Sequence, residues 1–235
     1  MYRRAYRGPV PTRSALTPVP PRLPSVVPLL EETDLGPDVH WERVEVRGDY
    51  MGESSEYVDI SESRLVGVRL TGVDLGQVTA RDTVFDGCDL SATALGEATL
   101  TRVVFHECRM GGVILSRSKL RDVTFSDCML DDANFRMVTG ERTLFDQSSL
   151  RAADFYGASL AVARFSGCDL RGAQFSKSNM KGARFHGSNV DAIKGADALK
   201  GVAIDPGQVV PFGLSVFAAL GIRVEDDVDD DEERG

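Results

Sequence analysis

The sequence has few of the features by which membrane proteins and common enzymes are recognised. Aromatic residues make up 7% of the 235 residues, with one Trp, three His and four Cys. No run approaches the roughly 18 apolar residues that a membrane-spanning helix needs. Phosphate loops, HExxH metal motifs and dinucleotide-binding glycine patterns are also missing. We therefore expect no enzyme activity, no cofactor and no bound metal.

The two ends differ in composition from the middle. Seven of the ten prolines fall within the first 28 residues, so residues 1–38 are predicted to form a Pro-rich disordered tail. The N-terminus lacks the continuous apolar segment of a secretory signal, although the absence of acidic residues before Glu31 leaves a transit peptide as the alternative. A cytoplasmic location is predicted. Residues 225–235 are predicted to form an acidic disordered tail.

The middle of the chain repeats every five residues. From Ile60 to Val190, every fifth position is a large apolar residue except Ala80 and Gly140. Two residues before each of these positions stands Val, Ser, Thr, Ala or Cys, without exception. The other three positions are mostly polar, charged or Gly. Each repeat thus has one large and one small inward position.

A five-residue period fits neither standard element. It would spread these side chains around an α-helix, and it would place successive ones on opposite faces of a flat strand. A chain that turns a corner every five residues keeps all of them inside. The pattern therefore predicts a coil with flat faces.

A second period gives the number of faces. Phe recurs every 20 residues from Phe85 to Phe185, and the four cysteines share one column spaced by multiples of 20. Like residues that recur at 20 predict four pentapeptides per turn, with each turn stacked on the last. At about 4.8 Å per turn, the coil would form a rod about 32 Å long.

These repeats resemble the pentapeptide-repeat family, whose motif A(D/N)LXX is matched by segments such as AADFYG, AVARFSG and CDLRGAQF. The resemblance covers somewhat over half of the chain and implies an all-β solenoid, a right-handed quadrilateral parallel β-helix. It also implies a partner class, because some members are DNA mimics that bind DNA gyrase or topoisomerase IV and protect against quinolones. This chain lacks the inserted loops of one branch of those proteins.

The cysteines and histidines suggest no active site. Cys88, Cys108 and Cys128 would stand on successive turns within disulfide-like distance, but buried free thiols are the favoured interpretation. His106 and His186 occupy outward positions with no nucleophile held in a pocket. Gly140 should leave a gap in its column, which Met137 or Val138 would fill by repacking.

The two ends of the coil need to be covered, because a solenoid exposes an apolar cross-section there. Residues 39–57, with the only Trp, are predicted to cap the N-terminal end of the coil of residues 58–192. Residues 193–224 are predicted to form a C-terminal helical unit that starts at Asp205-Pro206, ends at Gly221 and is followed by a short strand. Either this unit only caps its own coil or it also pairs two chains as a homodimer. The candidate residues for both roles are Val209, Phe212, Phe217 and Leu220.

Charge is distributed unevenly along the chain. The net charge is −9, yet residues 60–190 contain 16 basic and 15 acidic residues, so most of the negative charge lies outside the coil. On the face over the Phe column, an acidic stripe and an adjacent apolar column form a candidate protein-binding patch. Its residues are Asp86, Glu107, Asp127 and Asp146 with Val84, Val104 and Leu144.

The sequence therefore favours a non-catalytic scaffold that binds an unidentified protein partner through a flat coil face. The alternative, a DNA mimic that binds a type II topoisomerase, needs a strongly negative rod, and the near-neutral coil weakens it. We expect neither direct nucleic-acid binding nor membrane association.

Overall fold

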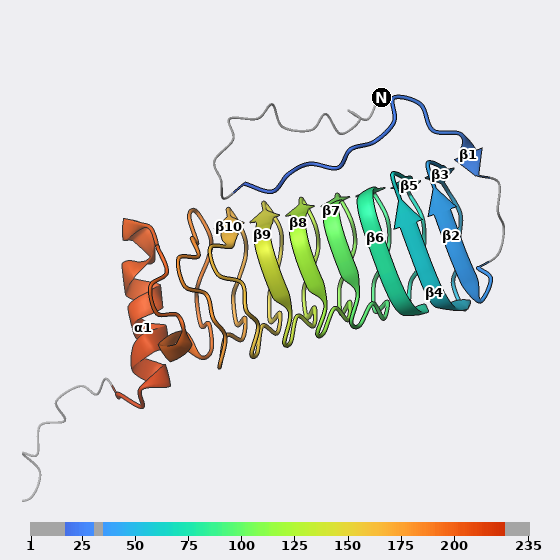
Figure 1. Cartoon of the computed structure of the whole chain (residues 1–235). Helices are drawn as coiled ribbons and strands as arrows, with labels where there is room; N and C mark the ends of the chain where they lie inside the picture. Colours follow the sequence, from blue (N-terminus) through green and yellow to red (C-terminus); the bar gives the residue numbers. More distant parts are fainter. Residues whose placement is uncertain (1–16, 31–34, 224–235) are drawn as a thin grey trace, which may run out of the picture.

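Parallel strand pairing with a register of 20 residues organises the chain into a coil of stacked turns (Figure 1). The computed structural model describes residues 17–30 and 35–223. The strands are β1 (Leu29–Leu30), β2 (Asp38–Glu42), β3 (Glu45–Val46), β4 (Ser54–Ser61), β5 (Arg64–Val66), β6 (Asp74–Asp86), β7 (Thr99–His106), β8 (Lys119–Ser126), β9 (Thr139–Asp146) and β10 (Arg164–Ser166). Three helical segments follow, namely η1 (Ala196–Ala198), η2 (Pro206–Gln208) and α1 (Val209–Ala219).

The 20-residue register holds on all four faces. β6 to β9 run across two faces, and single bridges such as Arg69 to Asp89 and Asp74 to Ala94 continue the same pairing on the other two. The structure is the parallel β-solenoid of about seven turns that the sequence predicted.

Inside the coil, two stacks of phenylalanine rings run along the axis. In the stack from Phe85 to Phe185, the ring centroids are 4.7–5.0 Å apart and the rings are nearly parallel. A second stack, Phe135 to Phe175, has spacings of 5.0 and 5.1 Å and meets the first edge to face. Both geometries are favourable for aromatic pairs, because they avoid opposing the negative ring faces directly.

The cysteines are free thiols inside the core. Cys88, Cys108, Cys128 and Cys168 are only 1–2% exposed and form no disulfide. Burial raises the pKa of the Cys168 thiol to about 11. Because the thiolate is the reactive form, these side chains are poor targets for thiol reagents at neutral pH.

The predicted N-terminal cap is itself a turn of the coil, although it is one residue shorter than the others. Trp41 pairs with Ile60 and Val46 with Leu65, an offset of 19 residues. The Trp41 and Tyr50 rings lie 5.9 Å apart and are almost fully buried, so large aromatic side chains cover this end of the core.

Helix α1 covers the other end. As predicted, Asp205 and Gln208 form a capping box, Pro206 occupies the first helical turn and Gly221 ends the helix with a φ of 72°. The predicted strand is not formed at Ile222, and Val224 and the acidic tail lie outside the described residues.

The prediction for Gly140 was wrong. A Cβ atom at this position would overlap Leu160 Cδ2 from the next turn, so Leu160 already fills the space. Met137 is 49% exposed, and Val138 keeps its own small inward position.

We therefore expect Gly140→Ala to destabilise the protein by about 1–3 kcal/mol, because the added methyl group would displace the fully buried Leu160. Denaturant unfolding would measure the change. Gly96→Ala is the matched control, since its Cβ would have no neighbour closer than 3.8 Å. Equal stabilities of the two variants would show that the core has room at Gly140.

Candidate protein-binding face

Two Asp–Arg pairs stand at one corner of the coil, each joining neighbouring turns. The Arg102 guanidinium donates to both oxygens of Asp82, at 2.6 and 2.5 Å. Arg142 donates to both oxygens of Asp122 in the same way, at 2.6 and 2.9 Å. Both carboxylates are only 4% exposed, although they belong to corner residues.

The Pro-rich segment of residues 17–30, here called the N-terminal arm, covers this corner. The Val19 amide donates to Asp122 Oδ1 and the Arg22 amide to Asp82 Oδ1, each at 2.9 Å. Farther along, β1 pairs with β3. Figure 1 shows the arm running across the successive turns of the coil toward β1.

The arm corrects two predictions. Of the expected disordered tail, residues 17–30 and 35–38 are placed against the coil, while residues 1–16 and 31–34 lie outside the described residues. In addition, Val84 and Val104 point outward from their strands but are only 2% and 3% exposed. Since an outward side chain is buried only under another segment, these residues lie beneath the arm and are not a free apolar surface.

Hydrogen bonding overcomes the cost of burying the two carboxylates. Burial alone would raise the pKa of Asp82, but the Arg102 guanidinium, the Arg22 amide and nearby positive charge lower that pKa below its ordinary value. Asp122 behaves in the same way with Arg142 and the Val19 amide. Each lowered pKa contributes stability that is present above the unfolded pKa of about 3.9 and is lost as pH falls through the folded value.

The acidic stripe (Asp86, Glu107, Asp127 and Asp146) lies beside the arm and is accessible. Glu107 and Asp127 are 58% and 55% exposed at the side chain. Strand register places Asp86, His106, Ser126 and Asp146 on successive turns. The structure therefore brings the acidic members of the candidate patch together. Of the apolar members, Leu144 is partly buried.

His106 stands within the acidic stripe, but its contacts do not form a catalytic triad. Its Nδ1 lies 3.1 Å from Ser126 Oγ and 3.9 Å from Asp127, while Nε2 lies 3.7 Å from Glu107. A triad needs the nucleophile and the orienting carboxylate on opposite ring nitrogens, whereas Ser126 and Asp127 approach the same one. Among the described residues, no group of three or more His, Cys, Asp or Glu is arranged to hold a metal ion.

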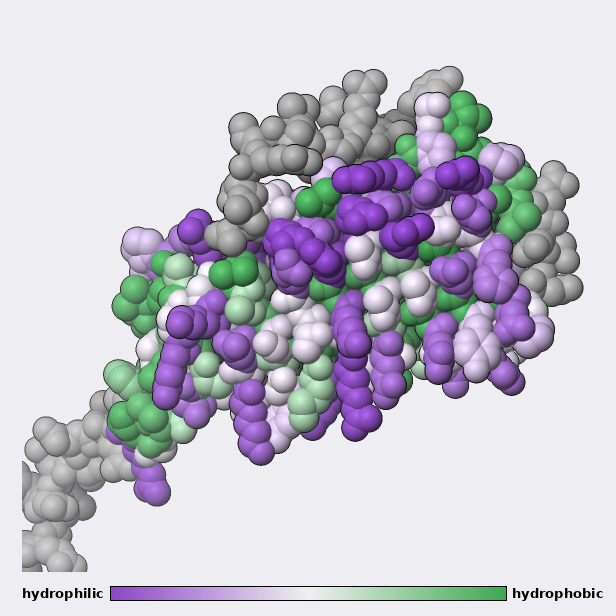
Figure 2. Space-filling view, in the orientation of Figure 1, coloured by the Kyte–Doolittle hydropathy of each residue, from purple (hydrophilic) through white to green (hydrophobic). Residues whose placement is uncertain are grey.

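Helix α1 has a narrow inner side and a wide apolar outer side. Phe212 and Val216 pack against the core and Ser215 is buried, so this side covers the last turn. Several large apolar side chains near and on the helix are instead 44–70% exposed, namely Val209, Val210, Leu214, Phe217, Leu220 and Ile222. Figure 2 shows apolar side chains gathered at this end of the molecule.

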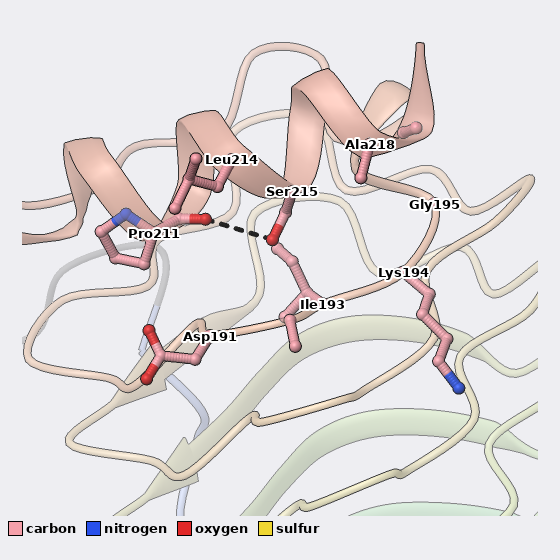
Figure 3. A pocket seen from close by; sticks show the side chains of 10 residues that line it. Asp191, Ile193, Lys194, Gly195, Pro211, Leu214, Ser215 and Ala218 are labelled. Atoms are coloured by element: carbon pink, nitrogen blue, oxygen red, sulfur yellow. Dashed lines mark hydrogen bonds between the residues drawn. The ribbon is translucent and has the colours of Figure 1, made fainter. Parts of the chain in front are cut away.

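A mainly apolar hollow of about 630 Å³ opens between α1 and the last turn. Figure 3 shows Pro211, Leu214, Ser215 and Ala218 on the helix side and residues 191–195 on the coil side. The Ser215 hydroxyl donates to the Pro211 carbonyl at 3.1 Å, so the polar group on the helix side is already satisfied.

A second hollow, which the sequence analysis missed, lies on another coil face and measures about 610 Å³. Small residues at Gly76, Gly96 and Ser116 recur every 20 residues and leave the face low, with Glu97 and Arg136 among the charged residues at its border. The recurrence of small residues at outward positions was the sequence signal that could have located it.

The fold and these surfaces define a solenoid scaffold whose flat faces carry different charges. The sequence pattern of the family described as pentapeptide repeat region matches residues 58–135 and 118–194, and the chain belongs to this family.

Two solved structures illustrate the likeness. HetL, a pentapeptide repeat protein involved in heterocyst differentiation regulation from the cyanobacterium Nostoc sp. strain PCC 7120, is 20% identical with a TM-score of 0.55; the match covers 68% of this chain and 84% of HetL. A trypsin-treated form of QnrB1, a plasmid-mediated fluoroquinolone resistance protein, is 20% identical with a TM-score of 0.49 and coverages of 83% and 95%. No curated protein matches the chain. Within the described residues, no helix is long and apolar enough to cross a membrane.

The buried Asp–Arg pairs should contribute measurably to stability. We expect Asp122→Asn to lower the free energy of unfolding by about 1–3 kcal/mol at pH 7, because it weakens hydrogen bonds to a charged group. Asp132→Asn is the matched control, since Asp132 is also a corner residue with positive φ but is exposed. The difference between wild type and Asp122→Asn should disappear below about pH 4, as the wild-type carboxyl becomes protonated. A pH-independent difference would contradict this account.

Proposed function

We propose that the protein is a non-catalytic scaffold that binds a protein partner through the acidic stripe. The accessible carboxylates of the stripe, held on four successive turns of one rigid face, carry this proposal. The parallel pairing fixes their spacing at about 4.8 Å per turn, so a complementary basic surface would meet a preformed row of charges. The proposal assigns the chain no chemical step, no cofactor and a cytoplasmic location, where its four thiols would stay reduced.

Mimicry of DNA, with gyrase or topoisomerase IV as the partner and protection from quinolones as the outcome, is the second candidate. The row of carboxylates favours it. However, the stripe has about one charge per 4.8 Å, whereas duplex DNA has one per about 1.7 Å. The same face also becomes basic at Arg164 and Arg184, two turns beyond Asp146. The general protein-binding scaffold is therefore the better supported of the two.

Affinity capture from a bacterial lysate would test the stripe. The triple variant Asp86→Lys, Asp127→Lys and Asp146→Lys should lose a partner that the wild-type chain retains. The matched control, Asp74→Lys, Glu97→Lys and Asp132→Lys, makes the same charge change on other parts of the coil and should keep that partner. Recovery of gyrase subunits, competed by DNA, would favour mimicry. If both triple variants retain the same proteins as the wild type, the stripe is not the binding surface.

We also propose that the outer side of α1 pairs with a second copy of the chain, while its inner side covers the coil. Leu214, Phe217 and Leu220 expose 56%, 44% and 61% of their surface at one end of the rod. Exposed apolar side chains gathered in one patch are typical of protein interfaces. A two-fold pairing of identical patches would bury both of them.

Sedimentation analysis should accordingly give the mass of a dimer for the full chain. The double variant Leu214→Asp/Phe217→Asp should give a monomer, because the charges would be buried in the interface. Val26→Asp is the control, since Val26 is an exposed apolar residue on the arm. A wild-type chain that is monomeric at high micromolar concentration would rule out this pairing.

A further inference from the structure

The two hydrogen bonds that hold the N-terminal arm have matching spacings on the arm and on the coil. On the arm, the donors are the amides of Val19 and Arg22, three residues apart. An extended proline-rich chain advances about 3.1 Å per residue and has three residues per turn, so these amides point the same way about 9.3 Å apart. On the coil, Asp82 and Asp122 are two turns apart, which is about 9.6 Å. A polyproline-like chain therefore fits the two acceptors without distortion.

The residues between the two donors suit the same geometry. Pro20 and Pro21 have no amide hydrogen, so no unpaired donor is placed over the coil between the two bonds. Below the arm, Val84 and Val104 provide a buried apolar floor. Arg102 and Arg142 hold both oxygens of each carboxylate, which fixes the acceptors toward the arm.

We propose that this corner of the coil is a binding site for extended proline-rich peptides, and that the chain's own residues 17–30 occupy it as an intramolecular ligand. Recognition uses two amide donors at positions i and i+3, prolines between them and an apolar floor, a mode in which the pre-extended ligand loses little entropy on binding. A second proline-rich chain enters only when the arm leaves. The inference is independent of the partner proposed above, because its ligand is part of this chain.

The first measurement asks whether the two amides hold the arm. Val19→Pro/Arg22→Pro removes both donors, keeps the segment extended and leaves every coil residue unchanged. Val104→Cys reports release of the arm, since the native cysteines are only 1–2% exposed and give a low background with a maleimide. We expect the introduced thiol to react at least tenfold faster when combined with Val19→Pro/Arg22→Pro. With Ser25→Pro/Val26→Pro, which adds two prolines at exposed arm positions, the rate should not change.

The second measurement tests the site with a separate ligand. A fluorescent synthetic peptide of residues 17–30 should bind the full chain that carries Val19→Pro/Arg22→Pro, with saturation detected by anisotropy. The same peptide with Pro in place of its Val19 and Arg22 should bind at least tenfold more weakly, and the wild-type chain, whose site is occupied, should also bind at least tenfold more weakly.

Two results would overturn the proposal. An unchanged labelling rate in the Val19→Pro/Arg22→Pro chain would show that these amides do not hold the arm. Faster labelling without preferential binding of the donor-containing peptide would show that the corner does not recognise a separate chain. A thermal melt equal to that of the wild-type coil excludes unfolding as the cause of faster labelling.

Discussion

Stacking of like residues on successive turns is the constraint on which the rest of the structure depends. Each turn pairs with the next at a register of 20 residues, so a side chain meets its counterpart at about one strand spacing along the axis. Nearly parallel phenylalanine rings fit this spacing, as the centroid distances of 4.7–5.0 Å in the first stack show. A turn of any other length would place a ring beside a small inward residue and leave the ring without its partner.

This constraint acts on the inward positions and leaves the outward ones free to differ from face to face. The face over the first phenylalanine stack can therefore carry an acidic stripe on four turns and arginines on later turns without any change in the fold. The corner beside it carries Asp82 and Asp122, each paired with an arginine one turn away. The coil supplies rigid spacing, and the outward residues supply the chemistry of the surface.

The inward pattern was sufficient to predict the fold, because periods of five and twenty have few structural solutions. Asp205, Pro206 and Gly221 likewise marked the C-terminal helix, since capping preferences are local. The arm was not predictable in this way, because a Pro-rich composition indicates an extended chain but not the surface on which it lies. Val84 and Val104 therefore looked exposed, although the arm buries them. The neighbour that fills the space at Gly140 depends on a rotamer of Leu160, which no sequence period determines.

A solenoid can usually gain or lose a whole turn during evolution, since each turn contacts only its neighbours. The N-terminal arm limits this freedom over part of the rod. An extra turn between Asp82 and Asp122 would fit the coil but would separate the two carboxylates by about 14 Å, beyond the reach of two amides three residues apart. Turns beyond the arm are under no such restriction. The arm thus acts as a ruler along the rod, and it links the length of one segment of the coil to the spacing of two residues near the N-terminus.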